Sequence, residues 1–179
     1  YNIKDSTIVV GHVGRFFEQK NHEFLLKIFR EVVSDCEEAV LLLVGEGELQ
    51  EEIRKKAKEY RIEDRIQFLG IRKDVARLWK GMDVFVFPSL FEGLPIVALE
   101  AQASGIRSVM ADTITSEVKL IDKVEFLSLQ DSPKKWSQTI LSYKGEERKG
   151  EENAVIRQAF AKAGYDIETA AQTLLSYYK

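Results

Sequence analysis

The sequence predicts an α/β protein with a doubly wound, mostly parallel, six-stranded Rossmann-like sheet flanked by helices. Six short apolar runs lack the polar–apolar alternation of a half-exposed strand, and such runs suit strands buried on both faces of a parallel sheet. Segments with helical spacing of apolar residues separate these runs, an order typical of parallel sheets. The 179 residues are enough for one domain with a substantial core.

The elements follow in a regular order along the chain. Gly105 is placed to end the fourth helix, Pro95 to be its first helical residue, and Ser132-Pro133 to begin the fifth. Residues 144–152 are charged and indicate an exposed connection, and we expect one domain over residues 1–179 with C-terminal helices in 153–179. The expected strands are residues 7–13, 39–44, 65–70, 83–88, 106–111 and 124–129, and the expected helices are residues 22–33, 48–60, 74–80, 96–103, 134–143, 153–163 and 167–179.

Composition excludes several classes of protein. With 45% hydrophobic residues, 31% charged residues and a net charge of −3, the chain is not expected to bind nucleic acid or anionic membranes in general. A single cysteine, Cys36, cannot form an internal disulfide and fits a reducing cytoplasm. No apolar run reaches the roughly 20 residues that span a bilayer. The chain begins at Tyr1 without an initiator Met, so we expect it to be part of a longer protein.

The stretch from Asp83 to Gly105 contains the most informative pattern. A buried strand leads through a turn into a helix that is apolar nearly all round, which predicts burial of the helix. Its one charge, Glu100, is then a buried carboxylate that needs a partner, and Glu92 lies in the preceding turn. A solvated Glu92 and a satisfied core Glu100 remain an alternative at this point.

Polar loops are predicted to gather at the carboxyl edge of the sheet, where ligands bind in this class of fold. Arg15 and Lys20 follow the first strand, and a lysine at a helix start opposes the helix dipole unless an anion is present. Across the crevice, Gly93 permits close backbone approach, and the free amides of Ile96 and Val97 suit a phosphate. We therefore expect a pyrophosphate between these two groups, with Glu100 accepting the two ribose hydroxyls.

Four motifs, in this order, resemble the family 4 retaining glycosyltransferases of the GT-B fold. They are the Gly14-Arg15…Lys20 loop, Val44 to Gly47, Phe68 to Gly70, and an E-x7-E element from Glu92 to Glu100. The resemblance implies the C-terminal, donor-binding half of that fold, with an N-terminal acceptor domain absent from this chain. It implies catalytic roles for Arg15, Lys20 and Glu92.

The resemblance also assigns roles within a nucleotide-sugar site. Arg15 and Lys20 would hold the donor diphosphate, Glu100 the ribose, and Glu92 the donor sugar. The backbone around Gly70, Ile71 and Arg72 would flank the base. The backbone from Leu94 through Ile96 to Val97 would meet the sugar or phosphates, and Gly45 and Gly93 complete the expected donor-binding set.

The implied activity is hexosyl transfer from a UDP- or GDP-sugar to a glycan or lipid-linked acceptor. Such enzymes act in capsule, exopolysaccharide or lipopolysaccharide synthesis, without a metal or other cofactor. The implied location is cytoplasmic, at the inner membrane face if the intact enzyme associates peripherally with it. The fragment alone would lack activity.

Some features depart from the family or leave other functions open. The loop after the fifth strand reads Asp112 to Glu117 where the family often has Gly-Gly-x-x-Glu, which puts that part of the pocket in doubt. A nucleotide-sugar epimerase-like GT-B enzyme and a non-catalytic nucleotide-binding module remain alternatives. A dinucleotide-binding module is disfavoured because Gly11 to Arg15 lacks the G-x-G-x-x-G pattern. His12 and His22 are interpreted as isolated structural or loop residues, and no metal-ligand cluster is visible.

Overall fold

The computed structural model describes residues 6–145 and 152–178 and confirms the predicted α/β class. Within these residues the chain forms one six-stranded sheet in the order β3-β2-β1-β4-β5-β6, with every pairing parallel. Every residue of β4 is buried, as its unbroken apolar run predicts. The strands are β1 (Val9–Val13), β2 (Val40–Val44), β3 (Ile66–Phe68), β4 (Val84–Phe87), β5 (Arg107–Ala111) and β6 (Val124–Leu127).

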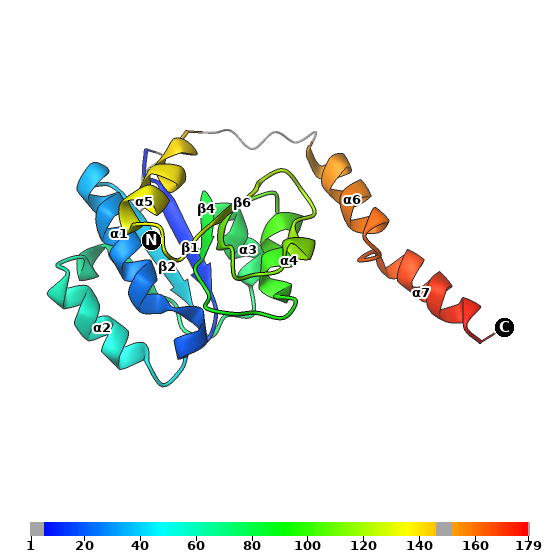
Figure 1. The fold of residues 1–179 in the computed structure, drawn as a ribbon, viewed down its shortest axis with the longest axis horizontal. Coiled ribbons are helices and arrows are strands. Elements are labelled where there is room, and N and C mark those ends of the chain that lie inside the picture. The colour runs from blue at the N-terminus through cyan, green and yellow to red at the C-terminus, as the bar shows by residue number, and fades with distance from the viewer. Residues whose placement is uncertain (1–5, 146–151, 179) are drawn as a thin grey trace.

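Helices cover both faces of the sheet (Figure 1). On one face α1 packs against α2 and α5, and on the other lie α3 and α4. The predicted helices are all present, although the third is shorter than expected. They are α1 (His22–Asp35), α2 (Gln50–Glu59), α3 (Val75–Leu78), α4 (Ile96–Ala103), α5 (Pro133–Ser142), α6 (Glu152–Lys162) and α7 (Ile167–Ser176).

The neighbouring strands β1 and β4 mark the place where the strand order reverses. The chain builds outward from β1 through β2 to β3, and then returns to place β4 on the other side of β1. In doubly wound sheets this arrangement opens a crevice at the carboxyl ends of the two central strands. The loop after β1 and the turn after β4 therefore face each other across one crevice.

The structure corrects two predictions about α4. Pro95 is the N-cap with extended backbone (φ −76°, ψ 104°) and not the first helical residue. The helix is not buried all round: Ala98, Leu99, Ala101 and Gln102 face the core, but Ile96 is 69% exposed and Glu100 is exposed. Gly105, with φ of +76°, ends this segment as predicted.

The C-terminal helices differ in how they contact the rest of the chain. Ile156 of α6 is buried beside Gly105, so α6 packs against the end of α4. Every α7 side chain that the structure describes is exposed. The predicted connection over residues 144–152 falls largely on 146–151, outside the described residues. Among the described helices, none combines the length and apolarity needed to cross a membrane.

Candidate functional site

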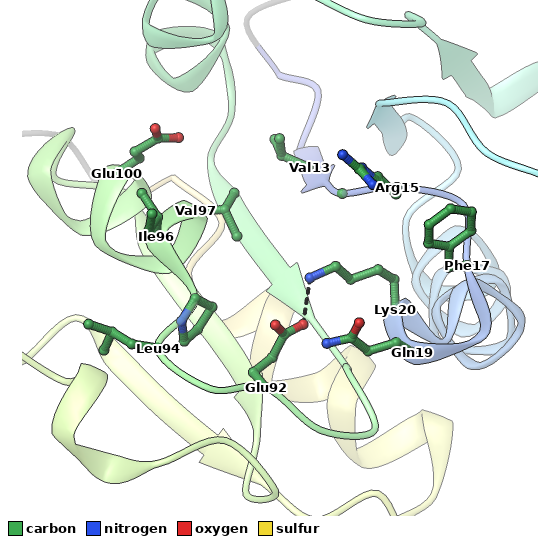
Figure 2. A pocket seen from close by; sticks show the side chains of 12 residues that line it. Val13, Arg15, Phe17, Gln19, Lys20, Glu92, Leu94, Ile96, Val97 and Glu100 are labelled. Carbon is green, nitrogen blue, oxygen red and sulfur yellow. Dashed lines mark hydrogen bonds and ion pairs between the residues drawn. The ribbon is translucent and has the colours of Figure 1, made fainter.

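A pocket of about 640 Å³ lies at the crevice between the loop after β1 and the turn before α4 (Figure 2). The loop contributes cations, and the turn and helix contribute carboxylates and apolar side chains. Seven of the predicted site residues line the pocket: Arg15, Lys20, Glu92, Leu94, Ile96, Val97 and Glu100. The remaining lining residues are Val13, Gly14, Phe17, Gln19 and Pro95.

Lys20 and Glu92 point toward each other across the pocket (Figure 2). Lys20 Nζ donates to Glu92 Oε1 at 2.5 Å, and only 16% and 8% of the two side chains are exposed. The ammonium also lies 4.8 Å from the centroid of the Phe87 ring, an arrangement that stabilises a cation. An ammonium has three N–H donors, so two remain for a ligand after the bond to Glu92.

Arg15 is exposed and lies in the same wall of the pocket as Lys20. Its guanidinium carbon is 6.0 Å from the centroid of the Phe17 ring. A guanidinium offers a planar fork to phosphate oxygens, whereas the ammonium of Lys20 acts as a point charge. Together they make this wall cationic.

The opposite wall is formed by the N-terminal end of α4. Leu94, Pro95, Ile96 and Val97 line the pocket there. The amide of Ala98 bonds to the Pro95 carbonyl at 2.9 Å, whereas the amides before it lie ahead of the helical hydrogen-bond ladder. The start of α4 therefore presents backbone donors and a positive dipole end to the pocket.

Glu100 lies at the far end of the pocket, with Ile96 and Val97 between it and Glu92 (Figure 2). It is exposed, so the prediction that Glu100 is buried was wrong. One side of α4 packs into the core, whereas Ile96, Val97 and Glu100 line the pocket. Glu100 also lines a second pocket of about 590 Å³, with Lys73 and Trp79. This position makes it accessible to a ligand that extends over both pockets.

Four predicted residues do not line the main pocket. Gly45 and Gly93 lie beside it: Gly45 (φ +133°) packs against the Gly14 carbonyl, and Gly93 is an exposed residue of the turn after Glu92. Ile71 is 74% exposed, and Arg72 donates Nε and Nη2 to the Asp74 carboxylate, both at 2.8 Å. The Arg72 guanidinium is therefore engaged with Asp74.

Sequence reasoning missed Gln19, which connects the two sides of the crevice. Its side-chain Nε2 donates to the Phe91 backbone carbonyl at 2.9 Å. Its backbone carbonyl accepts a hydrogen bond from the Leu90 amide at 2.8 Å. A glutamine in a polar loop shows no periodicity that reveals such a role. Nearby, the Thr113 hydroxyl donates to the Ser89 carbonyl at 2.8 Å, so the loop after β5 braces the same turn.

His12 and His22 are not isolated, contrary to the prediction. Both are buried, and their ring centroids are 4.6 Å apart in an edge-on arrangement. Burial lowers the pKa of His12 to about 4 and that of His22 to about 2, and the charge of Lys20 acts in the same direction on each. Both imidazoles are therefore neutral near pH 7. In the described part of the chain, no three His, Cys, Asp or Glu side chains form a group that could hold a metal ion.

Comparison with known sequences identifies a protein family for this chain. The profile described as "Glycosyl transferases group 1" matches residues 7–143. The putative glycosyltransferase EpsF of Bacillus subtilis is 37% identical over 172 residues, which cover 96% of this chain and 44% of that protein. A UDP-Gal:alpha-D-GlcNAc-diphosphoundecaprenol alpha-1,3-galactosyltransferase of Escherichia coli is 31% identical over 62% of this chain and 29% of that protein. The chain thus spans less than half of these curated relatives.

Solved structures share the fold at low sequence identity. Anabaena Alr3699/HepE in complex with UDP and glucose superimposes with a TM-score of 0.76 at 22% identity, over 97% of this chain and 48% of that one. WaaG, a glycosyltransferase involved in lipopolysaccharide biosynthesis, superimposes with a TM-score of 0.72 at 17% identity, over 91% of this chain and 43% of that one. These matches show the GT-B type of sheet and helices.

Proposed function

Because this chain belongs to the group 1 glycosyl transferases, we propose that it is the donor-binding domain of a retaining glycosyltransferase. The intact enzyme would transfer a hexosyl group from a nucleotide-diphospho-sugar to a glycan or lipid-linked acceptor. A relative named as an alpha-D-GlcNAc-diphosphoundecaprenol galactosyltransferase and a structural neighbour named for lipopolysaccharide biosynthesis support a role in polysaccharide assembly.

One observation carries this proposal: cations and a helix N-terminus face each other across a single pocket at the strand-order reversal. A diphosphate there would be neutralised by Arg15 and Lys20 on one wall and by the first amides of α4 on the other. Charge that develops on the leaving nucleoside diphosphate would be stabilised by the same groups. Loss of such stabilisation costs on the order of 10²–10³ in rate.

The two glutamates take different parts of the donor in this proposal. Glu100 would accept the ribose hydroxyls, since it is exposed at the far end of the pocket. The base would then extend toward the second pocket, whose Lys73 directly follows Ile71 and Arg72. Glu92, beside Lys20, would contact the donor sugar. The E-x7-E spacing would thereby put the two carboxylates on either side of the diphosphate, one at the sugar and one at the ribose.

The acceptor and its surroundings belong to the intact protein in this proposal. We place the acceptor on an additional N-terminal domain, in the part of the relatives that this chain does not cover. The intact enzyme would act in the cytoplasm, at the inner membrane face where lipid-linked acceptors are used. The reaction would require no metal, so diphosphate binding by this chain should be unchanged by EDTA.

Calorimetric titration of UDP, GDP, their hexosyl derivatives and inorganic pyrophosphate tests the donor site. Wild-type chain should bind a nucleoside diphosphate, and Lys20→Ala should weaken that binding at least about tenfold, because one charge-assisted contact is lost. Lys55→Ala, at an exposed position of α2, is the matched control and should bind as the wild type does. No binding by folded wild-type chain at millimolar ligand would overturn the proposal.

The same samples test whether this chain can transfer sugar without the rest of the intact protein. We expect donor binding without glycosyl transfer to any lipid-linked or glycan acceptor, since the acceptor site lies elsewhere. Transfer by the intact parent protein, with retained anomeric configuration in the product, would support the assignment. Epimerisation of the nucleotide sugar by the parent protein, with no transfer, would instead support the epimerase-like alternative.

A further inference from the structure

His12 spans the point where the two central strands separate. The ladder between β1 and β4 pairs Val10 with Val84 and Gly11 with Phe85, whereas the ladder between β1 and β2 continues to Val13. The next residues after the β1–β4 pairs are His12 and Val86. The His12 Nδ1–H donates to the Val86 carbonyl at 2.9 Å. A side-chain hydrogen bond thus continues the connection after the backbone ladder between these strands has ended.

The His12–Val86 hydrogen bond joins the same two strands whose following segments carry Lys20 and Glu92. The loop that carries Lys20 begins after β1, and the turn that carries Glu92 follows β4. Their ion pair, at 2.5 Å, therefore joins the segments that follow these two strands. The separation of the two strand ends therefore sets the separation of the two pocket walls.

The His12 ring and the Lys20 side chain both lie against Gly14. A methyl group placed on Gly14 would lie 3.2 Å from His12 Nε2 and 3.3 Å from both Cγ and Cδ of Lys20. The ring of Phe87, above which the Lys20 ammonium lies, has its centroid 5.8 Å from that of His12. The Lys20 stem and the His12 ring therefore converge on Gly14, and both lie near the Phe87 ring.

Packing alone does not explain an imidazole at this position. His12 Nε2 is buried without a hydrogen-bond partner in the described structure, and the same holds for both nitrogens of His22, whose ring stacks on Phe16 at 4.2 Å. An apolar side chain would fill this space without burying unpaired nitrogens. What an apolar side chain lacks is the donor to Val86. Since His12 is neutral, it supplies that donor without placing another positive charge beside Lys20.

We propose that His12 is a positioning residue of the diphosphate site. Its neutral ring, oriented by the Val86 carbonyl, fixes the spacing of the two walls and restrains the Lys20 stem so that the ammonium faces the pocket. This inference rests on the proposed function for the identity of the ligand. The geometry of Lys20 that it requires is independent of any ligand.

Three substitutions at position 12 separate the hydrogen bond from packing. His12→Asn keeps an N–H donor near the place of Nδ1, His12→Gln carries its amide farther out, and His12→Leu removes the donor at similar volume. We expect His12→Asn to bind pyrophosphate within about twofold of wild type and His12→Leu and His12→Gln about tenfold more weakly, in calorimetric titrations of the 179-residue chain. Ile140→Ala, in a buried position of α5, controls for a loss of core packing and should not change affinity.

A ligand-free measurement accompanies the titrations. In isotope-labelled protein, the Lys20 side-chain NMR resonance, assigned by its absence in Lys20→Ala, should differ from those of exposed lysines. It should keep its position in His12→Asn and move toward the exposed lysines in His12→Gln and His12→Leu. If His12→Leu does not fold, the comparison of His12→Asn with His12→Gln still decides whether the hydrogen bond to Val86 positions Lys20.

Wild-type affinity and an unchanged Lys20 resonance in His12→Gln or His12→Leu would show that His12 is only a core residue. Equal losses in His12→Asn and His12→Leu would also contradict the inference, because the donor would then be irrelevant. If the wild type binds none of the diphosphates, the proposed function fails, and the NMR comparison still decides whether His12 positions Lys20.

Discussion

At the scale of single residues, the Lys20–Glu92 pair determines how much charge the pocket offers a ligand. Both side chains are largely buried, so each is the principal neutralising group of the other. A partly buried charge that loses its partner is costly, whereas an anion from solution can take the place of the lost partner. In the proposed site, Glu92 would therefore compete with a phosphate for Lys20, although it would also contact the bound sugar.

This competition predicts opposite effects of Glu92→Gln on two ligands. Pyrophosphate and the free nucleoside diphosphate should bind about three- to tenfold more tightly, because the carboxylate no longer neutralises Lys20 or repels phosphate oxygens. The preference for the nucleotide sugar over the free nucleotide should decrease, because a sugar contact is lost. Calorimetric titration of both ligands measures this ratio. Weaker pyrophosphate binding would mean that Glu92 orients Lys20 instead of competing for it.

The two buried histidines make folding stability depend on pH. In the folded chain the pKa of His12 is about 4 and that of His22 about 2, against an ordinary value of 6.5. Below pH 6.5 the unfolded chain binds protons that the folded chain does not, so the free energy of unfolding decreases as pH falls. Each histidine contributes about 1.4 kcal/mol per pH unit in this range, or about 4 kcal/mol for both between pH 7 and pH 5.

Urea unfolding at several pH values between 7.5 and 5 measures this dependence. His22→Phe should reduce the slope by about half, because one of the two histidines is removed. Carboxylates with lowered pKa, among them Glu23 and Asp131, act mainly at lower pH, where their unfolded forms take up protons. A flat profile above pH 5 in the wild type would show that the histidines are not held neutral.

Residue identity predicted the charged groups of the pocket but not their partners. Arg15, Lys20, Glu92 and Glu100 were found because their charges stand out in apolar or Gly-containing segments. The Lys20–Glu92 bond joins residues 72 positions apart, and no local pattern reports such a contact. The burial of Glu100 was mispredicted because hydrophobicity does not distinguish a helix face that packs in the core from one that lines a pocket.

At the scale of elements, backbone hydrogen bonds join the loops after β1, β2 and β3. Gly14 N bonds to Val44 O at 2.9 Å, Phe16 N to Glu46 O at 3.1 Å, and Gly45 N to Gly70 O at 2.9 Å. The loop that carries Arg15 and Lys20 is thus supported from behind by its neighbours. Gly14, Gly45 and Gly70 of the predicted motifs each take part in this support.

Gly45→Ala tests the support of this loop. The new Cβ would lie 2.1 Å from the Gly14 carbonyl oxygen, at a φ of +133° that an alanine rarely adopts. We expect a loss of about 1–3 kcal/mol in unfolding free energy and weaker pyrophosphate binding, because the Gly14 backbone must shift. Gly81→Ala, where the added methyl meets open space, is the control. Unchanged affinity in Gly45→Ala would show that the Lys20 loop does not depend on this contact.

At the scale of the whole molecule, the fold was predictable because the central strands are mainly apolar and most of the segments between strands have helical spacing. The position of the pocket followed from the fold class, since ligands bind at the strand-order reversal. Contacts of the last two helices could not be predicted in the same way. Their apolar residues show helical spacing, but spacing does not say what a helix packs against.

Two shortened chains test how the C-terminal helices contribute to the domain. A chain that ends at residue 165 lacks α7, whose described side chains are all exposed, so its unfolding free energy should match the full chain within about 0.5 kcal/mol. A chain that ends at residue 145 also lacks α6 and should lose about 1.5–3 kcal/mol, because Ile156 no longer covers Gly105. Urea unfolding compares the three chains.

The same chains should differ in self-association. Leu174, Leu175, Tyr177 and Tyr178 are each more than half exposed, and removing such apolar surface reduces nonspecific contact between molecules. Sedimentation velocity should therefore show the chain that ends at residue 165 as more uniformly monomeric than the full chain, with the same affinity for pyrophosphate. A large loss of stability or affinity in that chain would show that α7 supports the sheet domain. It would contradict the expectation drawn from the exposure of the α7 side chains.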